Sequence, residues 1–113
     1  AVVARQLERA YAAFNRKHFG GGLPPIPVAW SRKLDKDCVG WYTPEGGEDG
    51  AILILEDLKR FPCVWRLTLL HEMAHVKLRN HPDETRSNSI KHSKAWVREM
   101  RRLAAAGAFD KIW

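Results

Sequence analysis

Apolar residues recur at steps of three and four positions in three stretches of the chain, which is the spacing of an amphipathic helix. The first stretch predicts a helix over residues 2–19, which the glycine run Gly20–Gly22 ends. The second predicts a helix over about residues 63–79, which stops ahead of Pro82 because the residue before a proline avoids helical backbone. The third stretch predicts a helix over about residues 93–106.

Three short, β-prone segments separate the first predicted helix from the second. They cover residues 26–30, 39–43 and 51–55. The last two are joined by the turn-forming residues 44–50, so we expect them to pair antiparallel. Because residues 51–55 do not alternate between apolar and polar types, we expect this strand to be buried on both faces. The order helix, three strands, helix, helix predicts an α+β fold.

The composition is that of a globular protein. The chain has 113 residues, of which 45% are hydrophobic and 28% are charged, so we expect one domain over residues 1–113. Cys38 and Cys63 make no disulfide framework, and we expect them to be reduced thiols. No apolar run approaches the roughly 20 residues that span a bilayer, and no signal-peptide core is present. We therefore expect no membrane partner and a cytoplasmic location.

The net charge of +6 is unevenly distributed along the chain. Residues 1–58 carry seven basic and eight acidic side chains, whereas residues 59–113 carry twelve basic and five acidic ones. Basic residues at helical spacing form a stripe on the last predicted helix: Lys91, Lys94, Arg98, Arg101 and Arg102. This basic stripe suits contacts with DNA phosphates, although an ordinary solvated helix face has the same pattern.

His71-Glu72-Met73-Ala74-His75 is an HExxH motif on the second predicted helix. Histidines four residues apart project from one helix face and can bind one metal ion. Glu72 can reach a water on that ion, whose lowered pKa lets the carboxylate take its proton as the water attacks a carbonyl. The other interpretation is two ordinary histidines beside an ordinary Glu, but burying such groups without a task is costly. The motif therefore predicts a Zn²⁺ site with Glu72 as general base.

A catalytic zinc site needs a third protein ligand and an open position. His81 stands six residues after the second motif histidine, which is the metzincin spacing, but Leu78 occupies the place of the required glycine. His92 lies just before the last predicted helix, from which a ligand can return over the zinc helix. Glu84 and Glu99 are the carboxylate options. We favour His92, and the other three candidates stay open.

Two further sets of side chains are candidates for substrate contacts. Tyr42 and Arg86 are candidates for stabilising the oxyanion of a tetrahedral intermediate. Trp30 and Trp41 are candidates for lining a substrate groove, although a core position is favoured for both. Trp96 is expected in the core.

The chain resembles the SprT-like (Spartan-type) family of zinc metalloproteases over nearly its whole length. The Thr68–His75 run matches the signature of that family closely. Ser93 stands where the family usually has glycine, and no cysteine follows Cys63 to form the C-terminal zinc ribbon of many members. The remaining matches are Phe14-Asn15, Phe19-Gly20-Gly21, Leu23-Pro24, Trp30-Ser31, Val39-Gly40-Trp41-Tyr42, residues 52–55, and His92-Ser93-Lys94-Ala95-Trp96.

The resemblance implies a minimal zincin-like fold, with an N-terminal helix, a three-stranded sheet, the HExxH helix and a C-terminal helix. It implies that His71, His75 and His92 bind zinc and that Glu72 is the general base. The family cleaves proteins, and its best-known members act on proteins crosslinked to DNA.

Our leading hypothesis is therefore a zinc-dependent endopeptidase, acting on a protein or peptide substrate that adds along an exposed strand edge. The first alternative is a non-enzymatic module, braced by zinc, that binds nucleic acid or protein. A hydrolase of a non-peptide amide is the second alternative.

Overall fold

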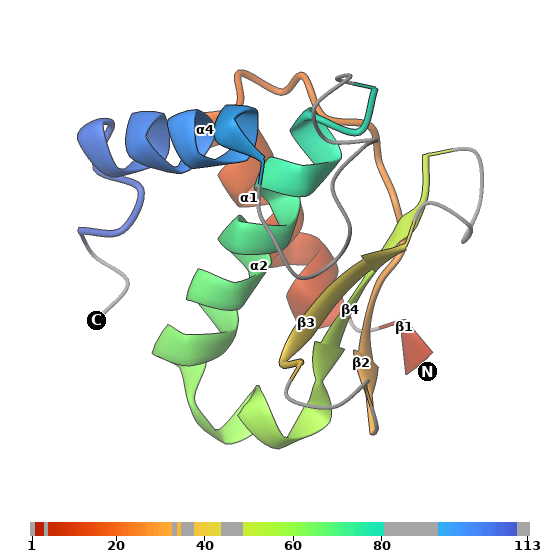
Figure 1. Ribbon diagram of the computed structural model, residues 1–113. Helices are drawn as coiled ribbons and strands as arrows, with labels where there is room; N and C mark the ends of the chain where they lie inside the picture. Colours follow the sequence, from red (N-terminus) through yellow and green to blue (C-terminus); the bar gives the residue numbers. More distant parts are fainter. Residues whose placement is uncertain are drawn as a thin grey trace.

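In the computed structural model, helices pack on one face of a small mixed sheet (Figure 1). The structure describes residues 2–3, 5–32, 34, 38–43, 49–80 and 93–110. The arrangement is α+β, as the sequence predicts. No helix among the described residues combines the length and the apolar character needed to span a membrane. The elements are β1 (Val2–Val3), α1 (Arg5–His18), β2 (Val28–Ser31), β3 (Gly40–Thr43), β4 (Ala51–Leu55), the 3₁₀ helix η1 (Glu56–Arg60), α2 (Pro62–Lys77) and α4 (Lys94–Ala105).

The strand order in the sheet is β1-β2-β4-β3. The expected antiparallel pairing of β3 with β4 is confirmed, whereas β2 runs parallel to β4. The expectation of three strands is incomplete, because Val2 and Val3 form a fourth strand against β2. The predicted start of the first helix at residue 2 is correspondingly wrong, since α1 begins at Arg5. A two-residue strand is too short to show an alternating pattern.

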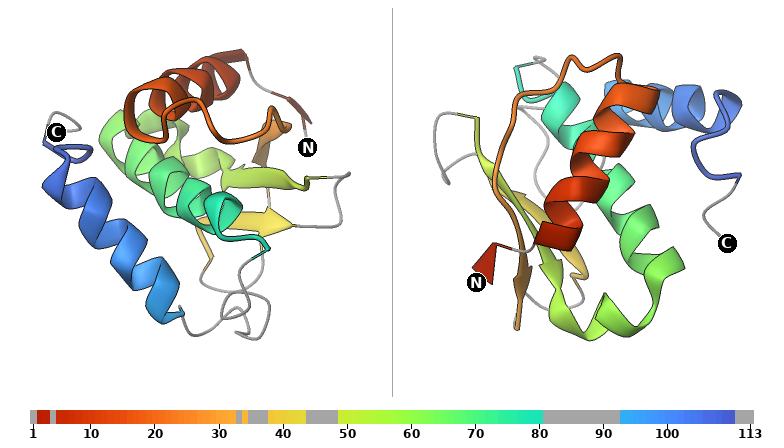
Figure 2. Two further views of the ribbon diagram at one scale, coloured as in Figure 1. Left: turned by 90° about the horizontal axis from the view of Figure 1, so that it is seen from above. Right: turned by 180° about the vertical axis from the view of Figure 1, so that it is seen from behind.

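The hydrophobic core fills the space between the sheet and helices α1 and α2. Ile52 and Ile54 of β4 are fully buried, while their neighbours in the strand are only half-buried. The expectation that β4 is buried on both faces is therefore wrong, because the helices of the described part of the chain cover only one face (Figure 2). Trp30 packs edge-on against Trp65, with ring centroids 6.0 Å apart. Both indoles are buried, so Trp30 is a core residue and does not line a groove.

The turn after α1 is held by side chains of the helix. Asn15 donates from Nδ2 to the Leu23 carbonyl at 2.9 Å and accepts from the Leu23 N–H at 3.0 Å. The Tyr11 hydroxyl donates to the Pro24 carbonyl at 2.6 Å. The chain reverses at Gly20, whose φ of 60° is in the left-handed region that favours glycine. These bonds explain why the turn lies against the helix that precedes it.

Helix α4 packs on α2, which lies between the sheet and α4 (Figure 2). Glu99 is buried, and its carboxylate accepts from Lys77 at 2.8 Å and from Arg102 at 2.8 and 2.6 Å. Arg102 also donates to the His18 carbonyl at 2.8 Å. Glu99 therefore ties α4 to the end of α2, and Arg102 extends the connection to the end of α1.

Candidate metal centre

His71 and His75 lie one turn apart on α2, with ring centroids separated by 5.5 Å. Two imidazoles that share one tetrahedral zinc ion at about 2.1 Å have ring centres roughly 5 Å apart. Both side chains are half-buried, whereas Leu70 and Met73 on the same helix are fully buried. The histidine pair therefore fits two ligands of one ion, on a helix that the core holds in place.

Glu72 is the buried member of the motif. Only 6% of the residue is exposed, and its Oε2 lies 3.8 Å from Nε2 of His71. The backbone of β3 approaches it at Gly40, which has no side chain to fill the space between them. The carboxylate is thus next to the histidine pair on one side and next to an edge strand of the sheet on another.

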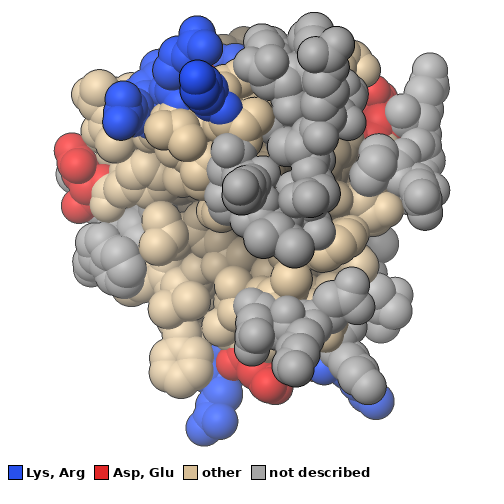
Figure 3. Space-filling view, viewed as in Figure 1, with Lys and Arg blue, Asp and Glu red and all other residues tan. Residues whose placement is uncertain are grey.

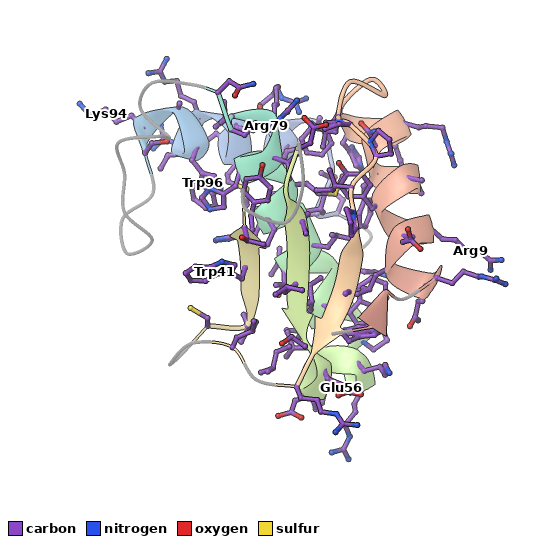
Figure 4. All side chains as sticks on the ribbon, turned by 90° about the vertical axis from the view of Figure 1, so that its right-hand side faces the viewer. Arg9, Trp41, Glu56, Arg79, Lys94 and Trp96 are labelled. Atoms are coloured by element: carbon purple, nitrogen blue, oxygen red, sulfur yellow. The ribbon has the colours of Figure 1, made fainter. Side chains whose placement is uncertain are left out.

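Trp96 of α4 packs against both histidines. Its ring centroid is 4.7 Å from that of His71 and 5.5 Å from that of His75, and it stacks on His75 with an interplanar angle of 23°. Its indole Nε1 donates to the His71 carbonyl at 3.3 Å. Trp96 is only partly buried and points from α4 towards α2 (Figure 4). Helical periodicity alone assigned Trp96 to the core; its place against the histidines depends on how α4 docks.

Ser93 begins α4 as its N-cap, since its hydroxyl oxygen accepts from the Trp96 N–H at 3.1 Å. This bond gives a local reason for serine at this position, where the resemblance leads one to expect glycine. It also joins the residue that follows His92 to the backbone of Trp96, whose indole contacts the histidines.

The outer edge of β3 carries backbone groups that point away from the sheet. The Leu55 N–H donates to the Val39 carbonyl at 2.9 Å, and hydrogen-bonded pairs alternate along an antiparallel ladder. Gly40 and Tyr42 are therefore non-hydrogen-bonded positions relative to β4, and their N–H and C=O groups face outward. No strand among the described residues pairs with this edge. Trp41 projects from the same strand (Figure 4).

The close approach of β3 to Glu72 at Gly40 was not predicted from the sequence. A glycine inside a strand pattern often marks a close approach of another group, and that signal was present in Val39-Gly40-Trp41.

The described residues contain no group of three or more His, Cys, Asp or Glu side chains placed to hold a metal ion. Glu99 does not complete the histidine pair, because Lys77 and Arg102 occupy its carboxylate. Burial alone would raise the pKa of Glu99, but the hydrogen bonds from Arg102 and Lys77 hold that pKa below its ordinary value. The other third-ligand candidates are His81, Glu84 and His92, and all three lie outside the described residues. The oxyanion candidate Arg86 lies outside them as well.

The Tyr42 hydroxyl donates to the Asp49 carbonyl at 2.8 Å, within the connection that leads to β4. Burial raises the pKa of Tyr42, and nearby Arg79 opposes that rise. The side chain is therefore a neutral donor whose proton is already used by Asp49. A contribution to an oxyanion site would require this bond to be exchanged.

The basic stripe divides into two parts. Lys94, Arg98 and Arg101 are exposed at helical spacing on α4, where a cluster of basic side chains is visible (Figure 3). Arg102 is bound to Glu99 and is 42% exposed, so it serves mainly to dock the helix. Lys91 lies outside the described residues.

Comparisons with known proteins do not assign a function, so any assignment depends on the side chains described above. No protein-family model matches the chain, and no curated protein matches it.

Proposed function

We propose that this chain is a zinc-dependent endopeptidase. The observation that carries the proposal is the grouping of His71, His75 and a buried Glu72 on one helix, beside an edge of β3 with which no described strand pairs. An ordinary pair of surface histidines would not require a buried carboxylate next to them.

His71 and His75 would hold the ion through their imidazole nitrogens. When bound, zinc would supply Lewis-acid activation of a water molecule and of a carbonyl group. Glu72 would accept the proton of the water that attacks the peptide carbon and pass that proton to the departing amine. Burial between α2 and β3 holds its carboxylate in one place, which is what a general base needs.

The outer edge of β3 would bind the substrate as an added strand. The outward N–H and C=O groups of Gly40 and Tyr42 offer main-chain hydrogen bonds to an extended peptide, without regard to its side chains. We expect such a site to prefer unfolded or flexible protein segments, because a folded segment cannot present its backbone in this way.

Within this proposal the fold is a minimal zincin, and the chain is a member of the SprT-like family. His92 is the proposed third ligand. The support for His92 is that the next residue, Ser93, caps α4 and that Trp96 contacts both motif histidines. Proteins associated with DNA are the proposed substrates.

The test combines metal content with cleavage. We expect one zinc ion per chain, cleavage of casein by the zinc-loaded protein, and loss of cleavage with a chelator. His75→Ala should lose the metal, and His92→Ala should weaken zinc binding. Zinc binding without cleavage of any unfolded protein would contradict the peptidase. If the ion also proved to have four protein ligands, the non-enzymatic zinc-braced module would be the better account.

The exposed part of the basic stripe supports a second candidate function, binding of DNA through α4. Lys94, Arg98 and Arg101 are exposed and can meet successive phosphates, because no side-chain hydrogen bond or ion pair ties them to another described residue, unlike Arg102. Replacing Arg98 and Arg101 by Gln should weaken binding to any duplex sequence. It should also lower the number of counterions released on binding, measured from the salt dependence of the affinity, by about two. Binding unchanged by this double variant would contradict the assignment to α4.

A further inference from the structure

Gly40 lies at the point where the edge strand meets the HExxH helix. A methyl group added to it would sit 2.5 Å from Cγ2 of Thr68, 3.0 Å from Oε2 of Glu72 and 3.3 Å from Cγ of Glu72. Ordinary contacts of a Cβ atom begin at 3.4 Å. The space that a side chain would need is therefore occupied by the general base and by the residue one turn before it.

The reason for glycine at this position is space and not backbone conformation. Gly20, Gly21, Gly50 and Gly107 are the described glycines with positive φ, and Gly40 is not among them. An alanine could adopt the backbone of Gly40, and only its contacts with α2 forbid it. The close approach is thus a property of how β3 packs on α2.

Neither neighbour on α2 can easily move aside. The Thr68 hydroxyl donates to the Val64 carbonyl at 2.8 Å, which fixes the rotamer that points its methyl group at Gly40. Thr68 is 8% exposed and Glu72 is 6% exposed, so each is surrounded by packed atoms. A side chain at position 40 would therefore move the strand, by about 0.9 Å or more to restore ordinary contact with Thr68.

We infer that Gly40 is a positioning residue for the proposed peptidase. Its missing side chain lets the outer edge of β3, where the substrate backbone would bind, lie directly against the Glu72 carboxylate. The inference rests on the proposed function. It adds that Gly40 determines the distance between the bound peptide and the Glu72 carboxylate. A displacement near 1 Å at a reacting centre can lower a rate by about 100-fold, even when binding is preserved.

The test compares wild type, Gly40→Ala, Thr68→Ser and the double variant with a fluorogenic peptide and zinc-loaded protein. In Gly40→Ala we expect kcat to fall about 100-fold, with KM changed less than about threefold, because the outward backbone groups of β3 are kept. Zinc content should stay at the wild-type value. Thr68→Ser removes the methyl group that lies closest, so it should leave the wild-type rate intact and restore about tenfold of the loss in the double variant.

A structural defect alone would give a different result. It would lower kcat only in proportion to the folded fraction, which urea unfolding measures in each variant. Should Gly40→Ala fail to fold, Thr68→Ala is compared with Gly40→Ala/Thr68→Ala, where the threonine side chain no longer obstructs the added methyl. The contact with Glu72 persists there, so a loss of about tenfold in kcat is still expected.

Two outcomes separate this inference from the proposed function. If the wild type cleaves the peptide and Gly40→Ala is within about twofold of it, the positioning role is wrong and the peptidase stands. If the zinc-loaded wild type cleaves nothing, the peptidase is wrong and the role of Gly40 is lost with it. A loss in Gly40→Ala that Thr68→Ser does not relieve would also overturn the steric argument.

Discussion

Replacing Glu99 by Gln removes the charge that docks α4 on α2. The Glu99 carboxylate accepts three hydrogen bonds at 2.6 to 2.8 Å from two cations, and its side chain is 5% exposed. A hydrogen bond to a charged group contributes about 1.5–3 kcal/mol, but such contributions are not additive. Lys77 and Arg102 are 39% and 42% exposed and can regain water, and a glutamine oxygen still accepts one bond. We therefore expect Glu99→Gln to lower the free energy of unfolding by about 2 kcal/mol.

The assay is urea unfolding at neutral pH, supported by thermal melting. A loss of about 2 kcal/mol corresponds to a fall in Tm of roughly 8 °C for a domain of this size. Arg98→Gln is the matched control, because Arg98 is an exposed residue of the same helix and should change stability by less than about 0.5 kcal/mol. A similar small change in Glu99→Gln would refute the docking role of the carboxylate.

The pH dependence gives a second check on the same residue. Because the folded pKa of Glu99 is lower than its ordinary value of 4.5, the unfolded chain binds this proton first as the pH falls. The stabilisation by Glu99 is complete above the unfolded pKa and is lost as the pH falls through the folded pKa. The difference between wild type and Glu99→Gln should therefore shrink below about pH 4.5. A difference that stays constant to pH 3 would show that the charge is not its source.

Three other predictions concern individual side chains of the fold and the site. Trp96→Ala should weaken zinc binding about 10- to 100-fold in a chelator competition, since the indole holds both motif histidines, and Trp96→Phe should lose less. Ser93→Ala should cost about 1 kcal/mol in urea unfolding through loss of the α4 cap, and Ser93→Thr should be close to wild type. Burial raises the pKa of Tyr11 to about 12, so its stabilisation is present below pH 10 and lost as the pH rises towards 12. As the pH rises from 10 towards 12, Tyr11→Phe should therefore lose less of its free energy of unfolding than wild type does.

Local patterns were enough to predict most of the secondary structure. The helical periodicity of residues 63–79 and 93–106 corresponds to α2 and α4 within about two residues at each end. The short 3₁₀ helix η1 and strand β1 were missed, because elements of a few residues carry no period. The parallel pairing of β2 with β4 was not predicted either, since it joins segments that are distant in the sequence.

The candidate site also combines features that local sequence spacing predicts with features that it does not. The grouping of His71 with His75 requires only the pitch of a helix, so sequence spacing predicts it. The place of Trp96 depends on the docking of α4 through Glu99, and the contact of Gly40 with Glu72 depends on how far β3 lies from α2. Both depend on tertiary packing, which a pattern along one chain does not contain.

The role of Glu72 is tested by comparing the cleavage rate of Glu72→Gln with that of wild type, at equal zinc content and on the same peptide. The variant should keep its zinc, because Glu72 is not a ligand, and its kcat should fall by about 100- to 10,000-fold. A variant that binds zinc and cleaves the peptide at the wild-type rate would contradict the assignment of Glu72 as the general base of a zinc peptidase.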